Sequence, residues 1–433
     1  MKLPTHLDVA KQYMPALGRF MIREHYGDFW EDETMTLPWM LRRARRKYKA
    51  FADRHIRPVA LQADIDPSSI DKDAIIKEYA EAGMSVELLP APIGTMNPVN
   101  IMRYGFDYAL KVEELTAACG GIALMLLAHD LGFAPLILSG HLTTHLRWTM
   151  PIARKLRRGE RYVMAFAITE PGAGSDVEDT EGAMKAKVVT RARKVDGGYS
   201  ITGRKVFISD GGIADAVTVF ACLGDEGLDS WTCFLVERGT EGFTTGRKEK
   251  KMGQKAGDAT ELIFEDVFVP DKNMIGPERS GWALNRAVLN FSRPFVGCIA
   301  LGIARGAYEH CLDFCRETRL GTKRLIDYQD VQIELADMFL KLLAGRSMVW
   351  YSAGHFLPKP MPAVSAATKT FCSDTSVEVC RKAMDIMGEH AYLHGNSVEK
   401  ALRDARLTQI YEGTNQINRL GIIEDIWDND IVK

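Results

Sequence analysis

The order of hydrophobic periodicities limits the fold of this chain more than any other sequence feature. Apolar residues recur at helical spacing over residues 36–161, alternate with polar residues over 162–275, and return to long helical patterns over 276–433. Strands that are not interleaved with helices argue against a Rossmann or flavodoxin-like sheet. We therefore predict an α+β fold: an N-terminal helical domain, a middle β-barrel or sandwich, and a C-terminal helical domain.

Local signals place individual elements within these regions. Asp196-Gly197-Gly198 separates two alternating segments and predicts a hairpin, because a tight turn needs residues that tolerate positive φ. Further strands are expected at 218–223, 231–237 and 261–270, and long helices at about 280–318, 328–355, 361–388 and 396–411. Residues 1–35 hold aromatic side chains without a clear period. They form an extension that could pack on the first helical domain or on a neighbouring subunit.

Charge and cysteine usage exclude several classes of function. The net charge of -2 gives no support for binding to nucleic acid or membrane. The basic run 41–49 carries its apolar residues at helical spacing, so we predict an amphipathic helix with a solvated basic face. The eight cysteines are scattered without a Cys-x-x-Cys pair, which favours reduced thiols in a cytoplasmic protein and no metal site. The apolar stretch 120–138 is interrupted by His129 and Asp130 and predicts a buried helix, not a membrane span.

Two short stretches carry residues suited to chemistry. In "AFAITEPGAGSD" (165–176), an apolar strand leads into a glycine turn where the hydroxyls of Thr169 and Ser175 can donate to ring carbonyls or phosphates. Alone, this stretch fits a plain tight loop or a cofactor loop. Phe207 and Ser209 share one strand face, which suits a flat heteroaromatic ring or ordinary core packing.

The second stretch, "IYEGTNQINRLGI" (410–422), places Glu412 where an apolar helical run meets a glycine. By itself this glutamate reads as a solvated carboxylate at a helix boundary. Its surroundings must show whether it faces a ligand.

Five segments together resemble the acyl-CoA dehydrogenase family: "AFAITEPGAGSDV", "GYSITGRKVFISDGG", "KMGQKAGDATELIFEDVFVP", "FSRPFVGCIALGIARGAYE" and "ALRDARLTQIYEGTNQINRL". They occur in the family's order and spacing. The resemblance implies a C-terminal four-helix bundle, a homotetramer, non-covalent FAD and an acyl-CoA substrate. It implies α,β-dehydrogenation to the 2-enoyl-CoA, with electrons passed to an electron-transferring flavoprotein.

The same resemblance assigns roles to individual residues. Glu412 matches the base that removes the α proton, and its own backbone N–H matches a donor to the thioester carbonyl. The positions that match FAD contacts are Phe166, Ile168, Thr169, Gly174, Ser175, Phe207, Ile208, Ser209, Arg319, Gln329, Asp385, Gly388, Thr414 and Gln416. Those that match substrate contacts are Ser175, Asn290, Arg293 and Gly413. Some family members carry the base at the position of Ser292, which a serine cannot replace.

The chain departs from the family pattern in three places. The segment 317–329 lacks the usual phenylalanine and is one residue shorter, so Arg319 is expected to clamp the FAD pyrophosphate across a subunit interface, with Lys323 or Arg324 as rivals. Glu389 stands where the family has a glycine. Ile122 replaces the arginine of glutaryl-specific members, which disfavours a dicarboxylate. Gly120-Gly121 could make room for a branched or cyclic acyl group.

Two other functions stay open at the level of sequence. An acyl-CoA oxidase-like enzyme, or one working in the reductive direction, would share the fold and the base. A catalytically silent subunit or scaffold would tolerate the altered pyrophosphate segment. A purified protein that carries FAD, and that an acyl-CoA reduces anaerobically, would separate these alternatives.

Overall fold

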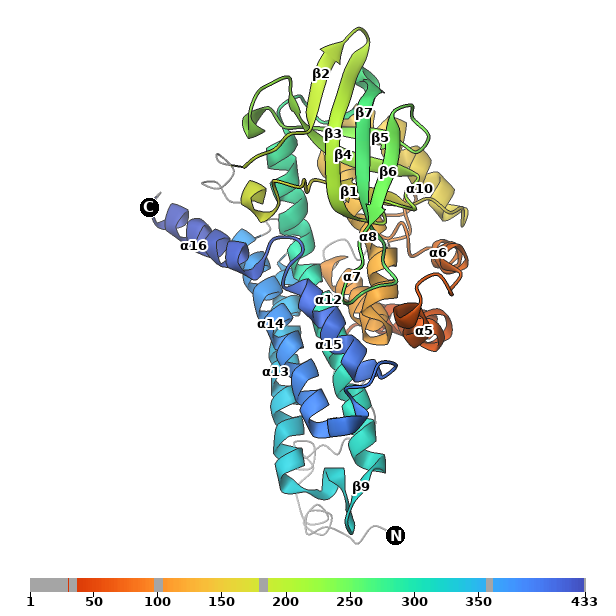
Figure 1. Cartoon of the computed structure of the whole chain (residues 1–433), viewed down its shortest axis with the longest axis vertical. Coiled ribbons are helices and arrows are strands. Elements are labelled where there is room, and N and C mark those ends of the chain that lie inside the picture. The colour runs from red at the N-terminus through yellow and green to blue at the C-terminus, as the bar shows by residue number, and fades with distance from the viewer. Residues whose placement is uncertain (1–29, 31–36, 97–103, 179–185, 356–360, 432–433) are drawn as a thin grey trace.

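A β domain sits on one end of a long helical bundle in the computed structural model, and shorter helices flank the junction (Figure 1). The structure describes Trp30 and residues 37–96, 104–178, 186–355 and 361–431. The N-terminal helices are α4 (Trp39–Phe51), α5 (Ala60–Ile65), α6 (Lys72–Glu81), α7 (Tyr104–Ala118), α8 (Gly120–Leu138), α9 (Leu142–Thr144) and α10 (Met150–Arg157).

Helix α4 confirms the interpretation of the basic run. Leu41, Tyr48 and Phe51 are buried, and most of the basic residues face solvent. Arg45 is the exception, since it is buried and its Nε donates to Glu114 Oε1 over 2.7 Å. The run is therefore an amphipathic helix face with one internal ion pair.

The middle domain is a mixed sheet of β1 (Met164–Ala167), β2 (Arg191–Val195), β3 (Gly198–Ser209), β4 (Ala216–Leu223), β5 (Thr232–Glu237), β6 (Phe243–Lys248), β7 (Ala259–Pro270) and β8 (Met274–Ile275). Its order is β6-β7-β3-β2-β4-β5-β8, and β1 pairs with β4. The β1–β4 and β2–β4 pairs are parallel and the others antiparallel. Strand β2 thus joins two halves of the sheet, as expected for a barrel-like or sandwich domain.

The predicted hairpin is present, with Val195 paired to Gly198 across a two-residue turn. Gly197 has φ 73°, which a residue with a Cβ adopts only at a cost. The other predicted strands correspond to β4, β5 and β7.

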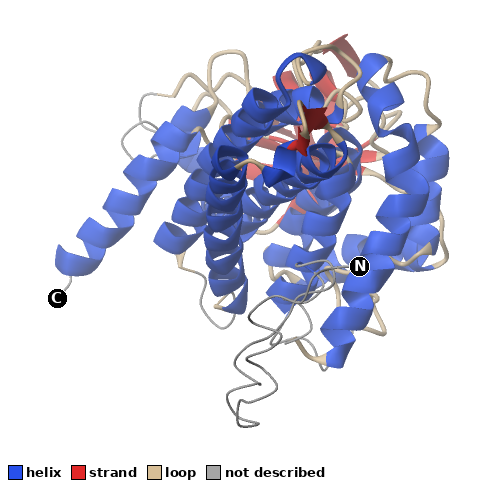
Figure 2. Ribbon diagram, turned by 90° about the horizontal axis from the view of Figure 1, so that it is seen from below, coloured by secondary structure: helices blue, strands red, loops and turns tan. Residues whose placement is uncertain are grey.

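The C-terminal region consists of α12 (Gly281–Glu317), α13 (Gln329–Gly354), α14 (Pro362–Met387), α15 (Ser397–Thr408) and α16 (Asn415–Ile431). Two short strands, β9 (Arg319–Leu320) and β10 (Lys323–Arg324), form a small hairpin between α12 and α13. Helix α12 packs against α13, α14 and α15 and also against α7 and α8. Together with α13, which packs on α7, it joins the bundle to the N-terminal helices. Figure 2 shows α16 projecting away from the remaining helices.

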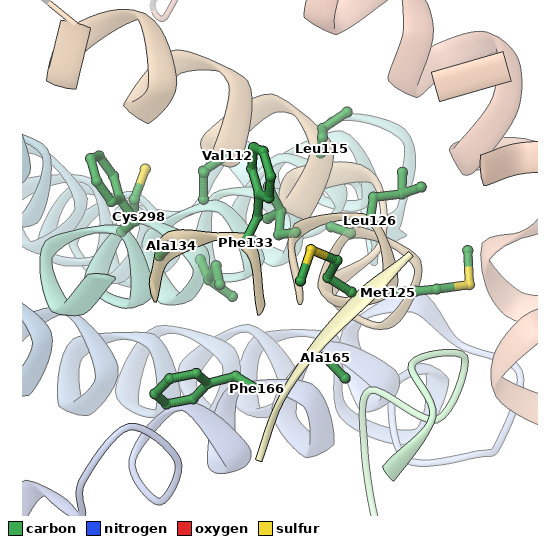
Figure 3. Close-up of a cluster of buried hydrophobic side chains, with 14 of the residues drawn as sticks. Val112, Leu115, Met125, Leu126, Phe133, Ala134, Ala165, Phe166 and Cys298 are labelled. Carbon is green, nitrogen blue, oxygen red and sulfur yellow. The ribbon is translucent and has the colours of Figure 1, made fainter. Parts of the chain in front are cut away.

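Helix α8 is buried between α7, α12 and β1. Figure 3 shows Phe133 and Ala134 of this helix beside Val112 of α7, with Ala165 and Phe166 of β1 nearby. Gly132 makes the contact with β1 possible, because a Cβ there would lie 2.6 Å from the backbone nitrogen of Ala165. Both α8 and α12 are long and apolar enough to cross a membrane. However, 78% of the most apolar 18-residue stretch of α8 and 83% of that of α12 are buried inside the fold. Their apolar residues therefore build the core.

Trp30 is the described member of the predicted N-terminal extension. It is buried against Phe339, with ring centroids 5.9 Å apart, and Arg346 lies over its ring at 4.0 Å. Both partners belong to α13, so this part of the extension packs on the bundle of its own chain. The rest of 1–35 lies outside the described residues. That it packs on the first helical domain or on a neighbouring subunit therefore stays a prediction.

Candidate active site

Glu412 lies in the tight turn between α15 and α16. It has φ 51° and Gly413 has φ 84°, so two successive residues in the left-handed region break the helical path. The turn is tied down at the Gly413 carbonyl, which accepts hydrogen bonds from Lys369 Nζ at 2.7 Å and Asn418 Nδ2 at 2.9 Å. A glutamate at positive φ is uncommon, and such strain persists where the surrounding contacts fix the backbone.

The carboxylate of Glu412 points toward α12. The Ser292 hydroxyl donates a hydrogen bond to Glu412 Oε2, and Arg293 Nε donates to the Glu412 carbonyl at 3.4 Å. Burial raises the pKa of Glu412 to about 7, against the Ser292 hydrogen bond and the Arg293 charge, which lower it. A carboxyl with a pKa near neutrality can take a proton more readily than an exposed glutamate.

The Glu412 carboxylate opens onto an apolar pocket. The pocket holds about 380 Å³ of empty space, part of it open to solvent. Its walls come from α7, α8 and α12 and consist of Tyr108, Val112, Leu127, Asp130, Leu131, Phe291, Ser292, Phe295, Val296 and Ile299. A carboxylate at the wall of an apolar pocket suits proton removal from a C–H bond of a bound apolar group.

A hydrogen-bond donor accompanies the carboxylate. The Glu412 backbone N–H donates to no acceptor among the described residues, although its neighbours Tyr411 and Asn415 both donate to backbone carbonyls. A free N–H beside a base can stabilise negative charge that develops on a nearby carbonyl oxygen. This observation fits the donor role that the family resemblance implies for Glu412 N–H.

Further charged groups surround the turn. The Glu178 carboxylate, at the end of the loop that follows β1, accepts from Arg293 Nη2 at 2.8 Å. Lys369 Nζ also donates to Asn415 Oδ1 at 2.8 Å, and burial lowers the pKa of Lys369 to about 7 against the Glu412 and Glu178 carboxylates, which raise it. Ser175 Oγ accepts from Thr414 N–H at 3.1 Å, so the middle domain is bonded directly to the turn.

The predicted substrate and turn residues therefore come together. Ser175, Arg293, Gly413 and Thr414 all contact this turn or one another. Asn290 lies one helical turn before Arg293 on α12 and is partly buried, and Gln416 is exposed at the start of α16.

The middle-domain residues form a second group. Val206 N–H donates to Thr169 O at 2.9 Å, which puts β3 beside the loop after β1. Phe207 is 60% exposed with φ 58°, while Phe166 and Ile208 are buried. Ile168, Gly174 and Ser209 are partly buried in the same region. An aromatic ring held open to solvent beside backbone and hydroxyl groups fits a flat ring such as that of FAD.

A buried ion pair supports this loop from behind. Lys205 Nζ bonds Glu170 Oε1 at 2.8 Å and Ile168 O at 2.9 Å, and both charged side chains are fully buried. Glu170 also accepts from Val189 N–H at 2.6 Å. The pair fixes the backbone on which Thr169 is carried.

The remaining predicted FAD contacts lie elsewhere in the chain. Arg319 in β9, Gln329 at the start of α13 and Asp385 in α14 are exposed, and Gly388 caps α14 with φ 56°. β9, which carries Arg319, lies at the end of the bundle away from the β domain (Figure 1). A single chain does not bring these residues to Glu412 or Phe207, so a role in FAD binding would require a second chain, as the family resemblance implies.

The structure corrects the expectation that Gly120 and Gly121 make room for the acyl group. A Cβ at Gly120 would meet Ile303 at 2.9 Å, and one at Gly121 would meet the Gln254 backbone at 3.0 Å. Neither glycine is among the pocket walls. Their small size serves close packing of α8, and the room for an acyl group comes from other residues.

Sequence reasoning missed four residues around the pocket or the Glu412 turn. Ser292 was dismissed as a base, yet its hydroxyl hydrogen-bonds the Glu412 carboxylate. Glu178 and Lys369 gave no signal because their partners are distant in sequence. Asp130 was noticed only as an interruption of an apolar stretch. It is 2% exposed, its Oδ2 accepts from Tyr108 at 2.7 Å, and its Oδ1 has no partner among the described residues.

Comparisons with known proteins agree with this architecture. Family models match in sequence order: acyl-CoA dehydrogenase, N-terminal domain over 41–155, middle domain over 165–267 and C-terminal domain over 279–426. These spans follow the helical, β and helical regions of the structure.

Similar proteins point the same way. A cyclohex-1-ene-1-carbonyl-CoA dehydrogenase of Syntrophus aciditrophicus is 37% identical over 341 residues, 76% of this chain and 79% of the relative. The structure of butyryl-CoA dehydrogenase from Megasphaera elsdenii matches with a TM-score of 0.82 and 30% identity, over 90% of this chain and 99% of the other. A chain described with the electron transferring flavoprotein of Acidaminococcus fermentans gives the same TM-score and identity over 90% and 98%. The chain belongs to the acyl-CoA dehydrogenase family of FAD-dependent oxidoreductases.

Proposed function

We propose that Glu412 is the base of an acyl-CoA dehydrogenase that acts on a cyclic acyl thioester. The observation that carries this proposal is the position of its carboxylate, at the wall of an apolar pocket and with a pKa raised to about 7 by burial. An α-C–H beside a thioester is a weak acid, so its removal needs a base with reduced solvation and a stabilised enolate.

The chain's own residues divide the work of the reaction. Glu412 takes the α proton, and its backbone N–H donates to the thioester carbonyl oxygen as negative charge develops there. Ser292 orients the carboxylate through its hydroxyl. Bound FAD would supply the acceptor for the hydride that leaves the β carbon as the α,β double bond forms. Phe207, Thr169 and Ser209 would hold its flat ring, and Ser175 would hold the acyl-CoA near the turn.

The acyl group is proposed to be cyclic. Helices α7, α8 and α12 supply broad apolar walls, including two phenylalanines from α12 and two leucines from α8. The relative from Syntrophus aciditrophicus acts on a cyclic thioester according to its name.

The assembly and the electron acceptor are also part of the proposal. We expect a homotetramer in the cytoplasm, in which Arg319, Gln329, Asp385 and Gly388 of one chain bind the FAD of another. Their exposure at the far end of the bundle supports this arrangement. An electron-transferring flavoprotein is the expected acceptor, since a similar chain is described with one.

Anaerobic titration of the purified holoenzyme tests the proposal. Cyclohexanecarbonyl-CoA and straight-chain thioesters of four to eight carbons are added separately, and bleaching of the visible flavin band is recorded. We expect the cyclic thioester to bleach the band fastest. Turnover of the straight chains alone would contradict the proposal of a cyclic substrate. A colourless protein that FAD does not reconstitute would contradict the proposed dehydrogenase activity.

Two further measurements separate the alternatives. Glu412→Gln should bind the thioester without bleaching, and bleaching at the wild-type rate would place the base elsewhere. Admission of oxygen to the reduced enzyme should give slow reoxidation, since rapid reoxidation with release of peroxide would indicate an oxidase.

A further inference from the structure

Glu178 occupies an unusual place beside the turn that carries Glu412. Its side chain is 5% exposed, and its carboxylate bonds Arg293 Nη2 at 2.8 Å. It also lies so close to Gly413 that a Cβ at that position would collide with Glu178 Oε2. A carboxylate in this position costs solvation free energy, and burial accordingly raises the pKa of Glu178.

Arg293 links this carboxylate to the turn. One edge of its guanidinium faces Glu178, and its Nε donates to the Glu412 carbonyl at 3.4 Å. The Arg293 side chain is 11% exposed, and without Glu178 its positive charge would have the Glu412 carboxylate as a competing partner. Direct pairing of Arg293 with that carboxylate would stabilise the ionised form and weaken it as a base.

The charged groups that face Glu412 come from several elements. Arg293 lies on α12, Glu178 follows the β1 loop, and Lys369 on α14 bonds the neighbouring Gly413 carbonyl. The pocket wall adds Asp130 from α8 and the phenol of Tyr108 from α7. Among these, Glu178 is the group bonded directly to the guanidinium that touches the turn.

We propose that Glu178 is a positioning residue that holds Arg293 on the Glu412 carbonyl and keeps its positive charge away from the Glu412 carboxylate. This inference rests on the proposed role of Glu412 as the base. It gives Glu178 an effect on the reaction that is exerted through its bond to Arg293. Its charge, beyond its volume, matters for the reaction.

The test is the pH dependence of flavin reduction by a saturating thioester under anaerobic conditions. Glu178→Gln keeps the size and an acceptor for Arg293 but removes the negative charge. Both the lost repulsion and the freed Arg293 charge favour ionised Glu412, so the acid limb should move to lower pH by about one unit. The plateau rate should fall by up to about tenfold, because a base of lower pKa accepts the proton less readily.

Matched variants identify the cause. Glu178→Asp should return the acid limb toward that of the wild type, because it restores the charge. Glu226→Gln removes an exposed glutamate that pairs with Arg279 in the middle domain, and it should leave the profile unchanged. An unshifted acid limb in Glu178→Gln, with full FAD occupancy in the visible spectrum, would overturn the proposal. So would a shift in Glu178→Asp as large as that in Glu178→Gln.

Failure of the base itself gives a different result. If the thioester reduces the flavin of Glu412→Gln with the pH profile of the wild type, Glu412 is not the base. The inference about Glu178 is then refuted as well. If Glu412→Gln is inactive while Glu178→Gln matches the wild type, only the role of Glu178 is refuted.

Discussion

Glu412→Gln should make the protein more stable as it abolishes flavin reduction. The folded-state pKa of Glu412 is raised from 4.5 to about 7, so its ionised form is disfavoured by the fold. At about 1.36 kcal/mol per pKa unit, the ionised carboxylate costs about 3 kcal/mol above pH 7. The cost develops as pH rises through 4.5 and is complete once pH exceeds the folded-state pKa. A neutral glutamine keeps an acceptor for the Ser292 hydroxyl and removes this cost.

Urea unfolding of the holoenzyme at pH 5 and pH 8 measures the effect. At pH 8 the variant should gain about 3 kcal/mol in the free energy of unfolding, and at pH 5 less than about 1 kcal/mol. Glu226→Gln, at an exposed ion pair, serves as the control and should show no such pH-dependent gain. Equal urea midpoints for Glu412→Gln and wild type at pH 8 would refute a burial-raised pKa.

Three further outcomes follow from other contacts. The rate of flavin reduction should fall to half near pH 7 and then about tenfold per unit below it, as Glu412 becomes protonated; a flat stopped-flow profile from pH 5 to 8 would contradict this. Lys205→Met should lower the free energy of unfolding by about 3–5 kcal/mol, because Glu170 would be left buried without its cation. Thermal unfolding measures this loss, and an unchanged Tm would show that the ion pair is dispensable. Phe207→Ala should weaken FAD retention about fivefold in a flavin-fluorescence release assay, whereas unaltered retention would remove Phe207 from the ring site.

The long helices were the most predictable part of the fold. The expected spans of α12, α13 and α14 differ from the observed ones by a residue at each end, because their apolar periodicity is sustained over many turns. Strand β6 was missed, since its sequence after Phe243 is exposed and polar. The parallel pairing of β1 and β2 with β4 also escaped prediction, because it depends on contacts between distant segments.

The candidate site was likewise predictable only in part. The residues that sequence indicated for the turn are local to it or lie in recognisable stretches, and Ser175, Arg293 and Gly413 do meet there. The electrostatic setting could not be predicted, because the Ser292–Glu412 and Glu178–Arg293 contacts span more than 110 residues each. The pKa of Glu412 depends on those contacts and on burial, neither of which periodicity reports.

The length of α12 has a consequence for chains that carry different defects. The part of the helix from Ser292, beside Glu412, to Glu317, two residues before Arg319, rises about 37 Å at 1.5 Å per residue. The proposed proton-accepting end and the proposed FAD-clamping end of one chain are therefore expected to serve different bound cofactors. Two inactive chains, one altered at Glu412 and one at Arg319, would then restore activity when mixed within one assembly. The site that pairs Glu412 of one chain with Arg319 of the other would be intact, so such alleles would complement each other.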